Sequence, residues 1–139
     1  MRVRAKKLRF SVDLAASGEL TEETGIVLDP PPEWKPEHLA LAALIRCSLT
    51  SLRYHAKRSS FDVTSASGNA RTLVTKEAGD VRYAMVKTEV ELRVEIEPEP
   101  GQAAMSDLLE FAERDCFVGA SLTHEPRYRW IVNGRTIGA

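Results

Sequence analysis

A long alternation of apolar and charged side chains sets the strongest limit on the fold. From Val86 to Ile96 the even positions are apolar or threonine, and the odd positions are charged. This period-two pattern predicts a β-strand that buries one face. At about 3.3 Å per residue, the sixteen residues 80–95 would extend roughly 50 Å. Because a compact chain of 139 residues has a radius of gyration of about 14 Å, the strand must bend sharply or be covered by a second chain.

The alternation changes parity once. Ahead of Val86 the apolar positions are odd: Val81, Tyr83 and Met85. A slip of one residue exchanges the two faces of a strand, so the pattern predicts a β-bulge near Met85–Val86.

A helix is predicted from Pro36 to about Lys57. Proline suits the first turn of a helix, and Glu37 favours the positive end of its dipole. The middle of this segment, Leu39 to Ile45, is apolar on every side. A helix that is apolar all round is buried all round, so we expect a central helix.

The other predicted elements are shorter. They are a hairpin of strands 2–14 and 25–29, two short strands 61–65 and 71–75 split by a turn at 67–69, an amphipathic helix 101–115 and a last strand 127–134. Helices and strands in this order predict one α+β domain over residues 1–139, with mostly antiparallel pairing.

Composition excludes several classes of function. The chain is 43% hydrophobic and 28% charged, with a formal net charge of −1, so no strong field attracts nucleic acid or a membrane. Its longest apolar run is too short to span a bilayer, and we see no signal peptide. We therefore expect a cytoplasmic protein, in which a structural disulfide would be rare.

Cys47 lies within the predicted central helix. Taken alone, a cysteine in this position is most often a small core side chain. Arg46 is the contrary sign, because a charge inside an apolar helix needs a partner or a cavity. The two side chains point about 100° apart, so contact between them is not implied. Core packing and thiol reactivity both remain open for Cys47.

Cys116 follows the second predicted helix and precedes a run of small residues. Packing is again one interpretation, although helix ends are more accessible than helix centres. The spacing of the two cysteines and three histidines matches no recurring metal site, so we predict no metal and no cofactor. The histidines concerned are His38, His55 and His124.

Two motifs resemble the OsmC/Ohr family, the osmotically inducible and organic hydroperoxide resistance proteins. "KPEHLALAALIRCSLTSL" is similar to the family's first-cysteine helix, which has a Pro-Glu-x-Leu start and a cysteine ten residues after the glutamate. "LLEFAERDCFVGASL" is similar to its second motif, Ala-Glu-x-x-Cys followed by a small-residue turn. The order of elements also agrees over nearly the whole chain.

The resemblance implies a fold and an activity. The fold is an antiparallel sheet wrapped around two central helices in an intertwined homodimer. The activity is thiol-dependent reduction of organic hydroperoxides, in which Cys47 attacks the peroxide and Cys116 resolves the sulfenic acid as a disulfide. Glu37 matches the family glutamate that holds an arginine near the thiolate. An external dithiol, for which a lipoyl-type compound is one candidate, would restore the thiols.

The chain departs from the family pattern at the arginine. The loop that carries it in the hydroperoxide-resistance branch reads "ASGELTEE" here, without arginine. Arg9, Arg46 and Arg53 are the candidates to replace it. Phe117 also stands where the family commonly has proline. The alternative to a peroxidase is therefore a non-enzymatic module on the same fold, which binds a small ligand or senses redox state.

Overall fold

The computed structural model describes residues 5–137, in two compact units that divide between Pro36 and Glu37. The N-terminal unit holds a three-stranded antiparallel sheet in the order β1-β2-β3. Its strands are β1 (Val12–Leu14), β2 (Leu20–Glu22) and β3 (Val27–Leu28). The prediction of one domain over residues 1–139 stays a prediction.

The predicted N-terminal hairpin is only partly right. β2 lies between the two predicted strands, and β3 pairs with β2 rather than with β1. Within residues 5–14 strand geometry is confined to Val12–Leu14, and residues 2–4 of the predicted strand lie outside the described part. Residues 5–11 have no neighbouring strand in the described chain to take up their backbone hydrogen bonds, which explains why the strand is shorter.

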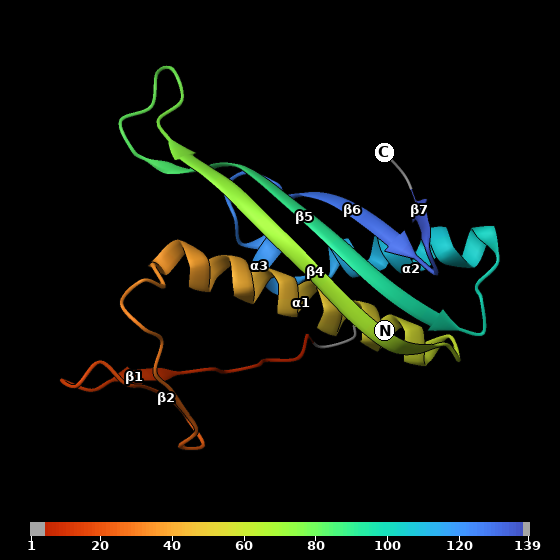
Figure 1. The fold of residues 1–139 in the computed structure, drawn as a ribbon, viewed down its shortest axis with the longest axis horizontal. Coiled ribbons are helices and arrows are strands. Elements are labelled where there is room, and N and C mark those ends of the chain that lie inside the picture. Colours follow the sequence, from red (N-terminus) through yellow and green to blue (C-terminus); the bar gives the residue numbers. More distant parts are fainter. Residues whose placement is uncertain (1–4, 138–139) are drawn as a thin grey trace. The chain divides into compact units, whose positions relative to one another are not determined.

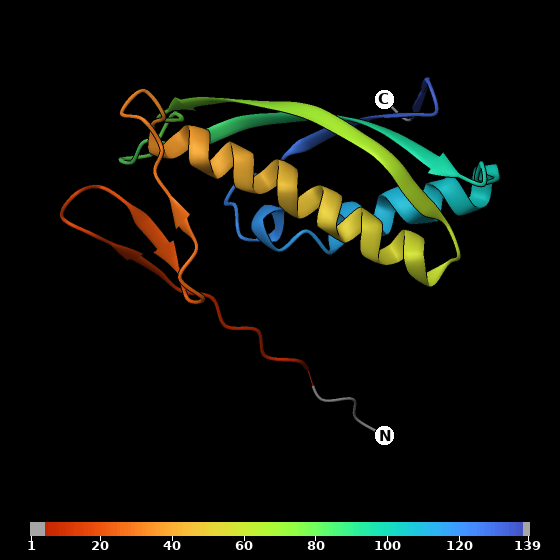
Figure 2. The ribbon, with the colours of Figure 1, turned by 60° about the horizontal axis from the view of Figure 1, so that its bottom comes forward.

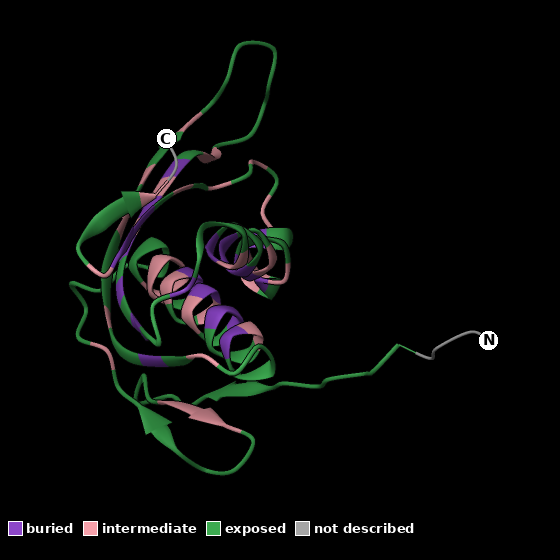
Figure 3. Cartoon of the chain, turned by 90° about the vertical axis from the view of Figure 1, so that its right-hand side faces the viewer, coloured by how far each residue is buried: buried purple, intermediate pink, exposed green. Residues whose placement is uncertain are grey.

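The larger unit is a four-stranded sheet with helices on its concave face (Figure 3). The sheet order is β4-β5-β6-β7, with β5 and β6 parallel and the other pairs antiparallel. The strands are β4 (Asp62–Thr75), β5 (Ala84–Glu97), β6 (Arg127–Val132) and β7 (Arg135–Ile137). The helices are α1 (Pro36–Arg58), α2 (Gln102–Arg114) and α3 (Phe117–Ala120) (Figure 1). The predicted α+β class is confirmed.

The long alternating segment forms β5, as predicted. Five alternate side chains of β5 are buried: Thr88, Val90, Leu92, Val94 and Ile96. Together β4 and β5 arch over α1, so the strands bend as their length requires (Figure 2). Leu73 pairs with Lys87 while Val74 pairs with Met85, which leaves Val86 as an extra residue. The predicted bulge at Met85–Val86 is therefore confirmed.

The turn predicted at residues 67–69 is wrong, because β4 runs through it without a break. Gly68 pairs with Leu92, and this is a point of close backbone approach. A Cβ on Gly68 would lie 2.6 Å from the Glu91 carbonyl oxygen and 2.7 Å from Leu92 Cδ2. Glycine within a strand often marks such an approach rather than a turn.

Gly68→Ala should lower the free energy of unfolding by about 1–3 kcal/mol, because the added methyl group overpacks the β4–β5 contact. Urea unfolding measures the change. Ser67→Ala is the matched control, since Ser67 is an exposed neighbour on the same strand. Equal midpoints for the two variants would contradict the close approach.

Helix α1 begins at Pro36, as predicted, and crosses the concave face of the sheet (Figure 2). Its buried residues are Leu44, Ser48, Ser51, Leu52 and Ala56. The opposite side is not buried in the single chain: Ala43 and Arg46 are both exposed. The expectation of burial on all sides therefore fails for one chain, because a single sheet covers only one side of the helix.

Strand β7 was not predicted. Asn133 and Gly134 both have positive φ angles, 50° and 79°, and turn the chain back on itself. An Asn-Gly pair favours this kind of tight hairpin. The Asn133 side chain also bonds both backbone groups of Ile96, accepting at 2.8 Å and donating at 3.1 Å. The turn is thereby attached to β5.

Candidate functional site: two thiols on one turn

Two free thiols meet at the short helix α3. Cys47 comes from the middle of α1, and Cys116 caps the N-terminus of α3. The Val118 N–H donates to Cys47 Sγ at 3.5 Å, and the Gly119 N–H donates to Cys116 Sγ at 3.4 Å. Consecutive amides of one turn therefore hold both sulfurs, although 71 positions separate Cys47 from Val118.

The two thiols differ in burial. Cys116 is fully buried, whereas Cys47 is half-buried. Burial is the largest cause that raises the pKa of the Cys47 thiol above its ordinary value. The Val118 amide lowers that pKa, and the neighbouring Cys116 thiol raises it further. At neutral pH the described chain therefore holds Cys47 mainly as the thiol.

A pair of hydroxyls, from buried Ser48 and partly buried Tyr128, adjoins Cys116. Ser48 Oγ donates to the Leu44 carbonyl oxygen at 2.8 Å and lies 2.8 Å from Tyr128 Oη. It also lies 3.5 Å from Cys116 Sγ. Burial raises the pKa of Tyr128 far above its ordinary value, so the phenol stays protonated and can donate.

The sequence interpretation missed both hydroxyls. Ser48 directly follows Cys47 in an apolar helix, which was a usable signal, because a buried serine needs a hydrogen-bond partner. Tyr128 lies 80 positions away, on β6. Nothing in the local pattern of that strand indicates that its ring reaches the cysteines.

An ionic contact fixes the chain just before Cys116. Asp115 ends α2, and one of its carboxylate oxygens lies 2.7 Å from His55 Nε2 on α1. The Arg114 guanidinium binds both oxygens of the same carboxylate, at 2.9 and 2.8 Å. Hydrogen bonding from Arg114 first, and then from His55, lowers the pKa of Asp115 to about 2. The contact joins α1 to the segment that positions the second thiol.

Glu37 is not brought to the thiols within one chain. It lies exposed in the first turn of α1, ten residues before Cys47. That spacing is about 15 Å along the helix axis. Its predicted role stays a prediction, and a bridging arginine or a second copy would have to connect it to Cys47.

The candidate arginines have different surroundings. Arg46 is exposed, and Arg53 donates to the Val63 carbonyl oxygen at 3.1 Å. Arg9 lies in the N-terminal unit. Within residues 5–137, the main groups that shift the pKa of Cys47 are two backbone amides and Cys116, and no guanidinium is among them.

Within the described part of the chain, no group of three or more His, Cys, Asp or Glu side chains could hold a metal ion. No helix within residues 5–137 combines the length and apolar character needed to cross a bilayer.

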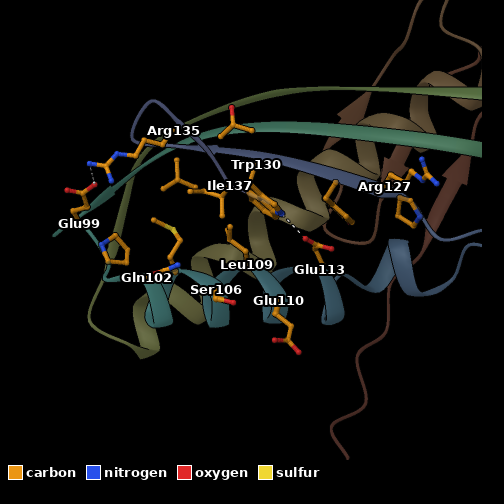
Figure 4. Close-up of a pocket in the computed structure, with 16 residues that line it drawn as sticks. Glu99, Gln102, Ser106, Leu109, Glu110, Glu113, Arg127, Trp130, Arg135 and Ile137 are labelled. Carbon is orange, nitrogen blue, oxygen red and sulfur yellow. Dashed lines mark hydrogen bonds and ion pairs between the residues drawn. The ribbon is translucent and has the colours of Figure 1, made fainter. Parts of the chain in front are cut away.

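A groove of about 1280 Å³ runs between α2 and the strands β6 and β7 (Figure 4). Its lining combines apolar side chains with charged ones at the rim, including Arg127 and an Arg135–Glu99 ion pair. Trp130 Nε1 donates to Glu113 Oε2 at 2.9 Å within it. Tyr128 lines the same groove, and its hydroxyl contacts Ser48 beside Cys116, so this tyrosine lies between the groove and the thiol pair.

A sequence profile described as "OsmC-like protein" matches residues 29–130, which include both cysteines. The chain belongs to the OsmC-like family. The resemblance seen in the two cysteine motifs is thereby confirmed. No curated protein sequence matches the chain.

Solved OsmC-like structures share the fold at low sequence identity. An OsmC-like protein from Vibrio cholerae is 17% identical with a TM-score of 0.72, and the alignment covers 90% of this chain and 100% of that one. An OsmC-like protein from Mycoplasma pneumoniae is 13% identical with a TM-score of 0.67, covering 93% and 99%. The organic hydroperoxide resistance protein OhrB of Bacillus subtilis is 17% identical with a TM-score of 0.55, covering 88% and 96%.

Proposed function

We propose that this OsmC-like protein is a thiol-dependent peroxidase that reduces organic hydroperoxides through Cys47 and Cys116. One observation carries the proposal: two free thiols, one half-buried and one buried, accept hydrogen bonds from consecutive amides of a single turn. Membership of a family that includes organic hydroperoxide resistance proteins supports it. The more accessible thiol meets the substrate, and the buried one completes the reaction.

The chemistry follows from this difference in burial. The Cys47 thiolate attacks the outer peroxide oxygen, the O–O bond breaks, and the alcohol leaves after taking a proton. Cys47 is then a sulfenic acid. The Cys116 sulfur attacks the Cys47 sulfur, water leaves, and a disulfide forms. An external dithiol reduces this disulfide by exchange and is itself oxidised.

A homodimer completes this proposal. Large apolar side chains are exposed in the single chain, and the side of α1 that includes Ala43 is uncovered. The exposed set in the N-terminal unit is Leu8, Phe10, Val12, Leu14, Ile26, Val27, Leu28 and Trp34. In the dimer the central helices of two copies pack together, and the sheets enclose them. Apolar surface on this scale is typical of an interface.

Substrate and reductant are tested by following peroxide loss. With cumene hydroperoxide and dihydrolipoamide, the reduced protein should turn over repeatedly. Dihydrolipoamide should support faster turnover than glutathione, because a dithiol releases itself from the mixed disulfide by ring closure. We propose that this cycle operates in the cytoplasm, where dithiol reductants keep thiols reduced. If the protein consumed no peroxide with dihydrolipoamide and none with glutathione, the proposed peroxidase activity would be wrong.

Cys116→Ala should lower the pH midpoint of alkylation at Cys47. The neighbouring thiol raises the pKa of Cys47, so its removal lowers that pKa and increases the thiolate fraction at a given pH. Rates of iodoacetamide labelling of the Cys47 peptide, measured against pH in reduced protein, give the midpoint. A midpoint that is unchanged or higher would show that the two thiols do not interact.

The same titration shows which arginine, if any, lowers the pKa of the Cys47 thiol. An arginine that stabilises the Cys47 thiolate lowers its pKa, so replacing that arginine raises the midpoint and slows turnover. Arg9→Gln, Arg46→Gln and Arg53→Gln are the three variants to compare. If none changes the midpoint, the binding or redox-sensing module becomes the better account, because burial then keeps Cys47 as a thiol.

A further inference from the structure

In the second chemical step, the attack of Cys116 on the Cys47 sulfenic acid, the buried Cys116 sulfur needs more hydrogen-bond donors than the backbone amides supply. Cys116 is fully buried, and its sulfur must lose a proton before it can attack the sulfenic acid on Cys47. An anionic sulfur away from water needs hydrogen-bond donors. The Gly119 amide supplies one of them, at 3.4 Å. Any further donor has to come from the side chains packed around the sulfur.

The hydroxyl pair beside Cys116 has a proton arrangement that can change. Ser48 has a single hydroxyl proton, and two acceptors lie within its reach: the Leu44 carbonyl oxygen at 2.8 Å and Cys116 Sγ at 3.5 Å. While Cys116 is a thiol, the Ser48 proton goes to Leu44. Rotation of the hydroxyl redirects the proton to the sulfur, because the Leu44 carbonyl already belongs to a helix and needs no second donor.

Tyr128 makes that rotation favourable. Its Oη lies 2.8 Å from Ser48 Oγ, and as a protonated phenol it donates to the serine oxygen in either orientation. A serine that accepts from one hydroxyl is a stronger donor to the next. A Cβ on Gly119 would lie 3.4 Å from both Cys116 Sγ and Tyr128 Oη, so the phenol oxygen and the sulfur both border Gly119.

We propose that Ser48 and Tyr128 form a hydroxyl relay that stabilises the Cys116 sulfur as it becomes the attacking thiolate. Ser48 contacts the reacting sulfur, and Tyr128 is a positioning residue that acts through Ser48. The step is Cys47–SOH plus Cys116–SH, giving the disulfide and water. The thiol proton leaves with the sulfenic hydroxyl as water, so no further oxidant or reductant is needed. The inference rests on the proposed redox function of the pair.

Tyr128→Phe tests the relay because it removes one hydroxyl and keeps the ring. Formation of the sulfenic acid, trapped with dimedone after rapid mixing with cumene hydroperoxide, should keep its wild-type rate. Disulfide formation at neutral pH should slow by about fivefold, the usual effect of losing a hydrogen bond between two neutral groups. Tyr83→Phe is the matched control, since Tyr83 is exposed.

Two further readouts separate a relay from simple packing. The deficit of Tyr128→Phe should disappear as pH rises, because hydroxide then removes the thiol proton. Adding Tyr128→Phe to Ser48→Ala should have no further effect, since the tyrosine acts through the serine. An equal deficit at every pH, an additive double variant, or a wild-type rate of disulfide formation in Tyr128→Phe would each overturn the relay.

The failure of the proposed function would look different. In that case the wild-type protein would form no sulfenic acid with peroxide at all. Diamide oxidises thiol pairs to disulfides without peroxide. With diamide, the rate of Cys47–Cys116 disulfide formation can still be compared between the wild type and Tyr128→Phe. Dependence of that disulfide formation on Tyr128 would support the relay, and independence would overturn it.

Discussion

Cys47→Ser should consume cumene hydroperoxide at less than about a thousandth of the wild-type rate, because the variant has no thiolate to attack the peroxide. Cys116→Ser should behave differently. Without reductant it should react once and stop with a sulfenic acid on Cys47, since the sulfur that would displace the hydroxyl group is missing. Stopped-flow peroxide consumption and dimedone labelling measure the two results.

The two serine variants control for each other. Both place a hydroxyl where a thiol stood, yet only Cys116→Ser should accumulate the dimedone adduct. Circular dichroism confirms that each variant is folded. If Cys47→Ser turned over at the wild-type rate, the assignment of the attacking thiol would be wrong. Accumulation of sulfenic acid on Cys116 in the Cys47→Ser variant would reverse the two roles.

Ala43→Glu should convert the protein from a dimer to a monomer. Ala43 is exposed on the side of α1 that the sheet leaves uncovered. In the proposed dimer a second helix packs there, and an unpaired carboxylate buried between two helices costs several kcal/mol. Sedimentation equilibrium should give twice the 15.4 kDa chain mass for the wild type and the single chain mass for Ala43→Glu.

Ala103→Glu is the control for charge. Ala103 is also an exposed helical alanine, but it lies on α2. This variant should stay dimeric. A well-folded wild-type monomer at micromolar concentration would contradict the homodimer, and dissociation by both variants would place the contact on a different surface.

Local pattern was sufficient for the longest elements. The period-two alternation from Val86 to Ile96 predicted β5, and the change of parity placed its bulge. Pro36 marked the start of α1. Each of these signals comes from neighbouring residues, and side chains two or four positions apart on a strand or helix share one environment.

Elements decided by distant contacts were harder to predict. The Ser67-Gly68-Asn69 segment looked like a turn, but Gly68 is required because the backbone of β5 comes so close. Strand β7 was missed although Asn133-Gly134 is a strong hairpin signal. The role of Gly68 depended on its partner strand, which a local pattern does not specify. The hairpin signal at Asn133-Gly134 was local, but these residues were included in the strand predicted over 127–134.

In the candidate site, too, local motifs revealed some residues, and contacts between distant segments decided the others. Both cysteines were recognised from their motifs, and the amides of Val118 and Gly119 hold both sulfurs. The hydroxyls of Ser48 and Tyr128 were not recognised, because they meet only after α1 and β6 pack together. The replacement for the family arginine was left open among three residues, and titration of Cys47 in the glutamine variants decides it.

The most direct test of the account is the redox state of the two thiols after an equimolar amount of cumene hydroperoxide. Intact mass spectrometry of the fully reduced wild-type protein should show the loss of two hydrogens. Peptide mapping should then find Cys47 linked to Cys116 within one chain. A protein that keeps both thiols free, or that joins cysteines of different chains instead, would contradict the proposed redox pair.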